Sequence, residues 1–170
     1  MYRVCVSLAV CLTALAGCRT GGAPVSVAPS EHKVVKTETY KGSQRDRECL
    51  MRAMYFESIR SSKEGLLAVG TVVMNRVDSP KFPDTVCGVV GQRKQFAPGV
   101  RTKKMRENTK LIANVADQVL AGKRHPQVRR AKFFHQAGLS FPYKNMHYVL
   151  EAGGNAFYEK RSRKRRKKTS

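Results

Sequence analysis

Residues 61–77 read SSKEGLLAVGTVVMNRV, and this stretch decides the fold. A serine followed three residues later by a glutamate, Ser61 to Glu64, has the capping-box pattern that starts a helix. From Leu66 to Val77 the residues are apolar on nearly every side. A helix that is hydrophobic all round lies in the interior of its domain. The stretch therefore predicts a central buried helix.

A second helix is predicted just upstream, with Asp46 as its cap and its end at about Arg60. Four of its residues fall at positions i, i+3, i+4 and i+7, which share one helix face: Leu50, Ala53, Met54 and Glu57. Three of the four are apolar, so this face turns inward. We therefore expect the carboxyl group of Glu57 to point into the core or into a cleft.

Shorter elements are predicted downstream of the central helix. In chain order they are a short helix over Thr85–Gly91, a loop over Gly91–Thr102, a helix over Lys104–Ala121, and strands over Ala131–His135 and Asn155–Tyr158. The stretch between the two strands contains Pro142 and is predicted to be irregular. The expected fold class is mainly α, or α+β with a small β element.

The N-terminus has the features of an export signal. Arg3 precedes an uncharged, mostly apolar run from Val4 to Gly17, which is shorter than the ~20 residues that a membrane span needs. The run ends in Leu-Ala-Gly before Cys18, which resembles a bacterial lipobox. We expect residues 1–17 to be a lipoprotein signal peptide and residues 18–44 to be a lipidated Cys18 with a flexible tether. The alternative is an ordinary secretory signal.

Export would leave two cysteines besides Cys18. Cys5 and Cys11 would be removed with the signal, and Cys49 and Cys87 would remain in a compartment that permits disulfides. The sequence leaves two alternatives open, a Cys49–Cys87 disulfide or two buried free thiols.

The chain is strongly basic, with 33 Lys and Arg against 12 Asp and Glu and a formal net charge of +21. This balance predicts an anionic partner. The polybasic tail, residues 159–170, is expected to be disordered and to contact anionic lipid or an envelope polymer. Nucleic acid is the alternative partner, but we expect none because the chain carries an export signal and no helix-turn-helix, zinc-finger or RNA-binding signature.

Glu57 is the first candidate for chemistry. Burial and the negative C-terminal end of a helix both disfavour its carboxylate, so both raise its pKa. A carboxyl group that stays protonated near neutral pH can donate its proton to a glycosidic oxygen. The alternative is a helix-end glutamate that reaches water or pairs with a nearby Lys or Arg.

An ordered series of short motifs carries a family resemblance. The motifs are Cys49-Leu50, Tyr55-Phe56-Glu57, Glu64-Gly65, Ala68-Val69, Val72-Val73, Asn75-Arg76-Val77, Phe82-Pro83, Thr85-Val86-Cys87-Gly88-Val89-Val90, Gln95-Phe96, Phe133-Phe134-His135 and Gly154-Asn155-Ala156-Phe157-Tyr158. In this order and spacing the chain resembles cell-wall hydrolases of the spore-cortex-lytic-enzyme type. The catalytic domain is expected at residues 45–158.

The resemblance implies a compact, lysozyme-like helical domain that acts on peptidoglycan, with Glu57 at the position of the family's catalytic acid. It also implies lytic transglycosylase-like chemistry, in which the C6 hydroxyl of N-acetylmuramic acid closes on C1 to give a 1,6-anhydro product. This sequence departs from the family at two places. Ser58-Ile59-Arg60 stands where Ala-Arg-Gly is usual after the glutamate, and Ala156 stands where a histidine is frequent.

Six further residues are candidates for substrate binding: Gln95, Phe96, His135, Tyr143, Asn155 and Tyr158. An amide can hydrogen-bond an N-acetyl group, and an aromatic ring can stack on a sugar. The alternatives are a capping Gln95, a core Phe96, a structural His135 and tyrosines that simply pack. Asn75, on the apolar central helix, is expected to brace the site.

Other functions remain open from the sequence. A two-carboxylate glycosidase needs a partner acid, but the nearby Glu64 and Asp84 are better explained as helix caps. A muramidase-type hydrolysis is the first enzymatic alternative. A zinc-dependent N-acetylmuramoyl-L-alanine amidase would draw on His32, His125, His135 and His147. A peptidoglycan-binding lipoprotein without catalysis is the non-enzymatic alternative. We expect a monomer with no cofactor and no metal.

Overall fold

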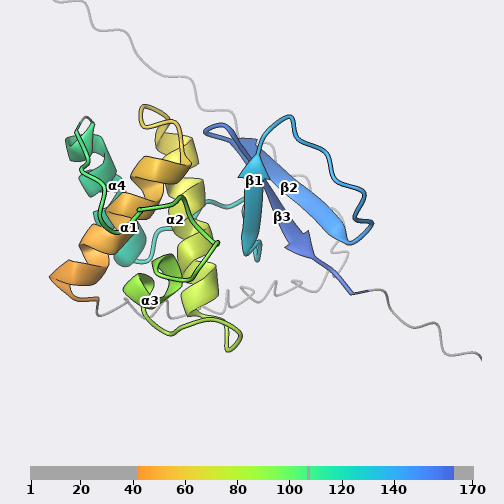
Figure 1. The fold of residues 1–170 in the computed structure, drawn as a ribbon, viewed down its shortest axis with the longest axis horizontal. Coiled ribbons are helices and arrows are strands. Elements are labelled where there is room, and N and C mark those ends of the chain that lie inside the picture. Colours follow the sequence, from red (N-terminus) through yellow and green to blue (C-terminus); the bar gives the residue numbers. More distant parts are fainter. Residues whose placement is uncertain (1–41, 107, 163–170) are drawn as a thin grey trace, which may run out of the picture. The chain divides into compact units, whose positions relative to one another are not determined.

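The computed structural model describes residues 42–106 and 108–162. Over these residues it contains α1 (Gln44–Glu57), α2 (Lys63–Val77), α3 (Val86–Val90), α4 (Thr109–Leu120), β1 (Phe133–Gln136), β2 (Met146–Ala152) and β3 (Asn155–Lys160). The helices group together beside one small antiparallel sheet (Figure 1). The predicted mainly α class with a small β element is confirmed. The expected signal peptide, Cys18 and tether to residue 41 lie outside the described residues, as do residues 163–170 of the tail.

Helix α2 is the buried centre that its sequence predicts. Its side chains at Leu66, Val69 and Val72 have no exposed surface, and α2 packs against α1, α3 and α4. The helix begins one residue later than predicted, because the hydroxyl of Ser62, and not that of Ser61, accepts the backbone N–H of Gly65 at 3.1 Å. No helix among residues 42–106 and 108–162 is long and apolar enough to cross a membrane.

Helix α1 is displaced from its predicted bounds at both ends. Ser43 is the cap and Asp46 is its capping-box partner, so the prediction of Asp46 as the cap was wrong. The helix ends at Glu57 rather than near Arg60, because Ser58 adopts an extended backbone and the N–H of Ile59 donates to the Gly153 carbonyl at 3.0 Å. Glu57 is therefore the last helical residue.

A disulfide between Cys49 and Cys87 joins α1 to α3. Of the two alternatives that the sequence left open, the structure contains the disulfide and not the free thiols. The backbone N–H of Cys87 also donates to the carboxylate of Asp46 at 3.0 Å, which ties the same two helices. The bridge closes a loop over a sequence separation of 38 residues. In the chain-entropy description, a loop of this size stabilises the folded state by about 4 kcal/mol.

Helix α4 begins at Thr109, five residues later than predicted. Asn108 has a left-handed backbone, with φ of 55°, which separates the helix from the preceding segment. That segment is held by tertiary contacts, since the N–H of Arg106 donates to the Tyr55 hydroxyl at 3.0 Å and Arg52 donates to the Lys103 carbonyl. The apolar stripe of α4 starts only at Leu111, and the lysines before it are exposed. Burial of an apolar face therefore does not extend the helix toward Lys104.

The sheet has the order β1-β3-β2, with both pairs antiparallel. Strand β2 was missed from the sequence, where its place was predicted to be irregular. Its pairing with β3 shifts register between Tyr148 and Leu150, so its side chains do not follow the plain alternation that reveals a strand. Strand β3 continues two residues past Tyr158, so Glu159 and Lys160 belong to the sheet and not to the basic tail.

Candidate active site

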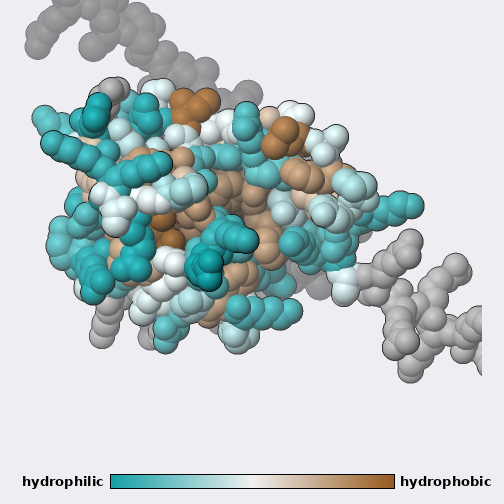
Figure 2. Space-filling model, viewed as in Figure 1, coloured by the Kyte–Doolittle hydropathy of each residue, from teal (hydrophilic) through white to brown (hydrophobic). Residues whose placement is uncertain are grey.

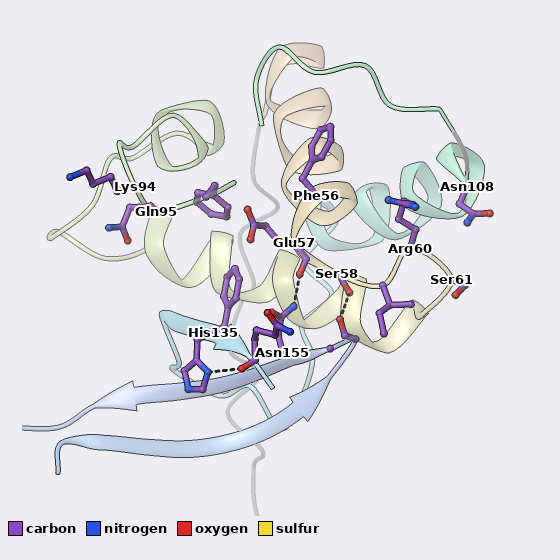
Figure 3. A pocket seen from close by; sticks show the side chains of 16 residues that line it. Phe56, Glu57, Ser58, Arg60, Ser61, Lys94, Gln95, Asn108, His135 and Asn155 are labelled. Carbon is purple, nitrogen blue, oxygen red and sulfur yellow. Dashed lines mark hydrogen bonds between the residues drawn. The ribbon is translucent and has the colours of Figure 1, made fainter. Parts of the chain in front are cut away.

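A cleft of about 840 Å³ lies where the end of α1, the loop after α3 and the β1 and β3 strands meet. Its walls are formed by Phe56, Glu57, Ser58, Ile59, Arg60, Ser61, Lys94, Gln95, Phe96, Asn108, Phe134, His135, Gln136, Gly153, Gly154 and Asn155. In the close-up, Glu57 projects from the end of α1 toward the space between the loop and the sheet (Figure 3). The space-filling view shows hydrophobic surface between the helices and the sheet, framed by hydrophilic residues (Figure 2).

Glu57 is held at two points. One oxygen of its carboxyl group accepts the backbone N–H of Ala97, from the loop after α3. Its main-chain carbonyl accepts the side-chain amide of Asn155, at the start of β3. Three segments that are distant in the sequence therefore meet at this one residue. The carboxyl group has a fixed position in the cleft wall as a result.

The pKa of Glu57 is raised above its ordinary value of 4.5. Burial is the main cause, because it penalises the charged form. The hydrogen bond from Ala97 and the positive charge of Arg76 both lower the pKa, and burial exceeds their combined effect. Glu57 points inward as the stripe on α1 predicts, and burial raises its pKa in the expected direction.

Arg76 is a charged residue of this region that was not among the site residues predicted from the sequence. It is only 3% exposed, and its Nε donates to the Lys132 carbonyl at 2.7 Å. Its guanidinium lies 5.2 Å from the ring centroid of Phe96 and 5.9 Å from that of Phe133. Burial lowers its pKa to about 10, so it stays charged at neutral pH. One signal was available in the sequence, an arginine on a helix that is otherwise apolar.

Four of the six predicted binding residues line the cleft: Gln95, Phe96, His135 and Asn155. Phe96 is also part of the hydrophobic core, which is the alternative that the sequence left open for this residue. Tyr143 and Tyr158 do not line the cleft but a separate hollow at the sheet. Asn75 braces the region as expected, because its amide donates to the carbonyls of Arg129 and Ala131 just before β1.

Of the two departures from the family pattern, the one after Glu57 lies at the cleft and the one at Ala156 is buried in the sheet. Arg60 lines it, with its guanidinium 4.9 Å from the ring centroid of Tyr55. Ala156 pairs with His135 across the sheet and is 2% exposed. The sequence shows these residues only as differences from the family, because it does not show which residues surround them.

A contact between glycines brings the β2–β3 turn to the cleft. A Cβ atom built on Gly65 would lie only 2.4 Å from the Cα of Gly153, so no side chain fits at position 65. Gly153 itself has a φ of 56°, in the left-handed region that glycine adopts readily. This close approach seats the turn against the start of α2, where its carbonyl receives the N–H of Ile59.

Glu57 is the only carboxylate among the cleft residues that the structure describes. Glu64 lies in the first turn of α2, 3.3 Å from the Nε2 of His125, and Asp84 is an exposed residue just before the Thr85 cap of α3. Neither acid is itself the cap that the sequence suggested. Over the described ranges there is no group of three or more His, Cys, Asp or Glu that could hold a metal ion.

Comparison with known proteins agrees with this architecture. A family model described as Cell Wall Hydrolase matches residues 60–158, a range that begins three residues after Glu57. A spore cortex-lytic enzyme of Oceanobacillus iheyensis is 35% identical over 77 residues, which cover 45% of this chain and 24% of that protein. A spore cortex-lytic enzyme of Bacillus cereus is 41% identical over 54 residues, 32% of this chain and 21% of that protein.

Two solved structures share the fold. The catalytic domain of the Bacillus cereus SleB protein superposes with a TM-score of 0.57 and 25% identity, over 69% of this chain and 92% of that one. The catalytic domain of the germination-specific lytic transglycosylase SleB from Bacillus anthracis superposes with a TM-score of 0.55 and 27% identity. This match covers 70% of this chain and 98% of that one. The chain thus spans about a quarter of the full-length relatives but nearly all of these catalytic domains. The resemblance inferred from the ordered motifs is confirmed.

Burial of Glu57 has a consequence for stability. Because its folded-state pKa lies above its unfolded-state pKa, the unfolded chain releases this proton more readily, and ionisation lowers the stability of the fold. The loss begins as pH rises through the unfolded value and is complete above the folded one. We expect Glu57→Gln to melt at a higher temperature than the wild type at pH 8 and at the same temperature at about pH 3.5.

Thermal denaturation followed by circular dichroism at the two pH values measures this difference. Glu48→Gln is the matched control, because Glu48 lies on the same helix with its side chain 61% exposed. It should change the melting temperature little at either pH. A difference in melting temperature between Glu57→Gln and the wild type that is the same at both pH values would show that the carboxylate is not penalised by burial.

Proposed function

Because the chain belongs to the cell wall hydrolase family, we propose that it is a peptidoglycan hydrolase that cuts the glycan strand between N-acetylmuramic acid and N-acetylglucosamine. In this proposal Glu57 is the single general acid and base, and the reaction is lytic transglycosylase-like. The observation that carries the proposal is the lone carboxyl group of the cleft, fixed in position and raised in pKa.

Each property of Glu57 suits one part of this chemistry. The raised pKa keeps the carboxyl group protonated at a higher pH than an ordinary glutamate, so that it can donate a proton. The hydrogen bond from Ala97 fixes the direction of the carboxyl group, and the one from Asn155 to the main-chain carbonyl holds the residue in place. Together they keep the acid at one point along the scissile bond. The charge of Arg76 then favours the carboxylate that remains after the proton has left.

The proposed reaction returns Glu57 to its starting state. The carboxyl group protonates the oxygen that bridges the two sugars, and the bond between that oxygen and C1 of N-acetylmuramic acid breaks. The carboxylate then accepts the proton of the C6 hydroxyl, whose oxygen bonds to C1. The product carries a 1,6-anhydro ring, and no second protein carboxylate is needed. In a two-carboxylate glycosidase the second group would lie about 5–9.5 Å from the first.

Gln95 and Phe96 extend the proposal to substrate binding. Both line the cleft beside Ala97, whose N–H holds the acid, so a sugar that contacts them would lie next to Glu57. The exposed amide of Gln95 suits an N-acetyl group, and the edge of the Phe96 ring offers an apolar wall. Asn155 has its amide committed to the Glu57 carbonyl, so we assign it to positioning of the acid rather than to sugar contact.

The test of this function is product analysis with a matched pair of variants. Purified wild type, Glu57→Gln and Glu64→Gln are incubated with peptidoglycan, and the soluble products are identified by mass spectrometry. We expect anhydro-muropeptides from the wild type and from Glu64→Gln, whose side chain lies outside the cleft. Glu57→Gln should be slower by about 10²–10⁴-fold, the usual contribution of general acid–base catalysis.

Three other outcomes would overturn parts of the proposal. Muropeptides with reducing ends would mean that water, not the C6 hydroxyl, attacks C1. Stem peptides freed from intact glycan strands would identify an amidase. Equal rates for the wild type and Glu57→Gln would show that Glu57 is not the catalytic acid. Absence of product from every variant, including the wild type, would favour a peptidoglycan-binding protein without catalysis.

We also propose that the protein is exported and anchored to a membrane of the cell envelope through a lipid on Cys18, facing the periplasm or cell wall. The apolar run and the small residues before Cys18 support this. In bacteria grown with labelled palmitate, the wild-type protein should incorporate the label and the Cys18→Ser variant should not. Equal labelling of both would refute the anchor. The polybasic tail would then contact anionic lipid or polymer of the same envelope.

A further inference from the structure

A second surface, of whose residues only His135 also lines the cleft, gathers six rings that we call the aromatic face: Phe133, His135, Phe141, Tyr143, Tyr148 and Tyr158. Residues that stand opposite each other in antiparallel strands share a face of the sheet. Tyr158 stands opposite Phe133 on one side and Tyr148 on the other, which places all three on one face. The opposite face carries Phe134 and Phe157 and packs into the core.

The rings of the aromatic face are in mutual contact. Tyr158 stacks on Phe133 with centroids 5.6 Å apart, and it lies 5.6 Å from Tyr148 and 5.7 Å from His135. The chain of contacts continues from His135 to Phe141 at 4.8 Å and from Phe141 to Tyr143 at 6.3 Å, nearly parallel. The face is thus a continuous surface of rings rather than scattered aromatics.

Three of these rings are open to solvent. Tyr143 is 65% exposed, Tyr148 is 50% and Phe141 is 43%, and the neighbouring Leu139 is 53% exposed. These four residues and Ile59 are all the large hydrophobic side chains that are exposed in the described part of the chain. Single exposed hydrophobic residues such as Leu139 and Ile59 are common, but three exposed rings on one continuous aromatic surface mark a binding surface.

The aromatic face contains a hollow of about 390 Å³ with polar groups at its rim. Phe141, Tyr143 and Tyr158 line it, and Asn145 and Lys160 contribute an amide and an ammonium group. The ammonium nitrogen of Lys160 lies 4.4 Å from the ring centroid of Phe133, so it stays close to the rings. Apolar walls with a few hydrogen-bonding groups are the usual composition of a ligand site.

His135 connects this hollow with the cleft, because it lines both. Its Nδ1 lies 2.8 Å from the Gln136 carbonyl, which can only accept, so Nδ1 carries the proton. In the neutral ring Nε2 then accepts from the Tyr148 hydroxyl, also at 2.8 Å. These two hydrogen bonds fix the imidazole at the boundary between the two sites.

We propose that the aromatic face is a second saccharide subsite, which holds an N-acetylated sugar of the same glycan strand while another sugar lies at Glu57. This rests on the proposed function for the identity of the strand. A pyranose ring presents a face of C–H bonds that packs on aromatic rings, while its edge carries hydroxyl and acetamido groups for Asn145 and Lys160. The positive charge of Lys160 also suits the lactyl carboxylate of an N-acetylmuramic acid that carries no stem peptide.

The absence of tryptophan from the chain gives a direct test. Tyr143→Trp places a single indole on the aromatic face, and Glu57→Gln in the same full-length protein prevents cutting. The probe is a purified, peptide-free glycan fragment of N-acetylglucosamine and N-acetylmuramic acid. We expect a saturable change in indole fluorescence as the fragment is added. Adding Phe141→Ala should raise the half-saturation concentration by about tenfold, and adding Leu139→Ala should leave it unchanged.

Kinetics separate this subsite from the catalytic acid. With Glu57 intact, the double variant Phe141→Ala/Tyr143→Ala should raise KM for long strands by about tenfold with little change in kcat. Leu139→Ala, on the same loop, should have wild-type constants. If the wild type cuts no glycan but the indole still responds, the proposed function fails and the subsite stands.

Two results would overturn the subsite. One is a wild type that cuts glycan while the indole gives no response and the double variant keeps the wild-type KM. The other is an indole that responds to vesicles of phosphatidylethanolamine and phosphatidylglycerol but not to the glycan fragment, which would make the aromatic face a membrane contact. A circular dichroism spectrum of each variant confirms that it is folded.

Discussion

Burial of one carboxyl group at the end of a helix is the constraint on which the site depends. Glu57 lies on the inward stripe of α1, and the helix stops at this residue because Ser58 turns into an extended backbone. The penalty of burial is only partly offset by the N–H of Ala97 and the charge of Arg76, so the pKa of the group stays high. The disulfide to α3 and the packing on α2 hold α1 in place against this cost.

Much of this arrangement follows from local sequence patterns. The apolar stretch before Val77 predicted the buried α2, and the stripe ending at Glu57 predicted an inward carboxyl group. These predictions succeed because the side chains of one helix share a face through fixed spacing, whatever the rest of the chain does. The ordered motifs added the family and the position at which the acid is expected, which physical reasoning about one glutamate could not supply.

The features that were missed depend on partners that are distant in the sequence. Strand β2 pairs with β3 through a register shift, which hides its alternation. Arg76 lies on a helix predicted to be apolar, and its role follows only from the rings and the carbonyl that surround it. Tyr143 and Tyr158 were placed in the cleft because both are aromatic, but the pleat of the sheet turns Tyr158 to the other face.

The cleft and the aromatic face together suit a long polymer better than a small substrate. The cleft offers one acid and few apolar walls, whereas the aromatic face offers rings and no carboxylate among the residues that line its hollow. His135, which lines both, would keep the two at a fixed separation along a strand. We therefore propose that the chemistry comes from the helices and much of the binding from the sheet.

The protonation of Glu57 in the folded protein tests the central claim most directly. The carboxyl carbons of glutamate, labelled with ¹³C, can be titrated by NMR, and Glu57→Gln identifies the signal that belongs to Glu57. We expect a midpoint clearly above the ordinary value of 4.5. A midpoint at or below that value would mean that the Ala97 hydrogen bond and Arg76 outweigh burial, and that Glu57 is not held as an acid.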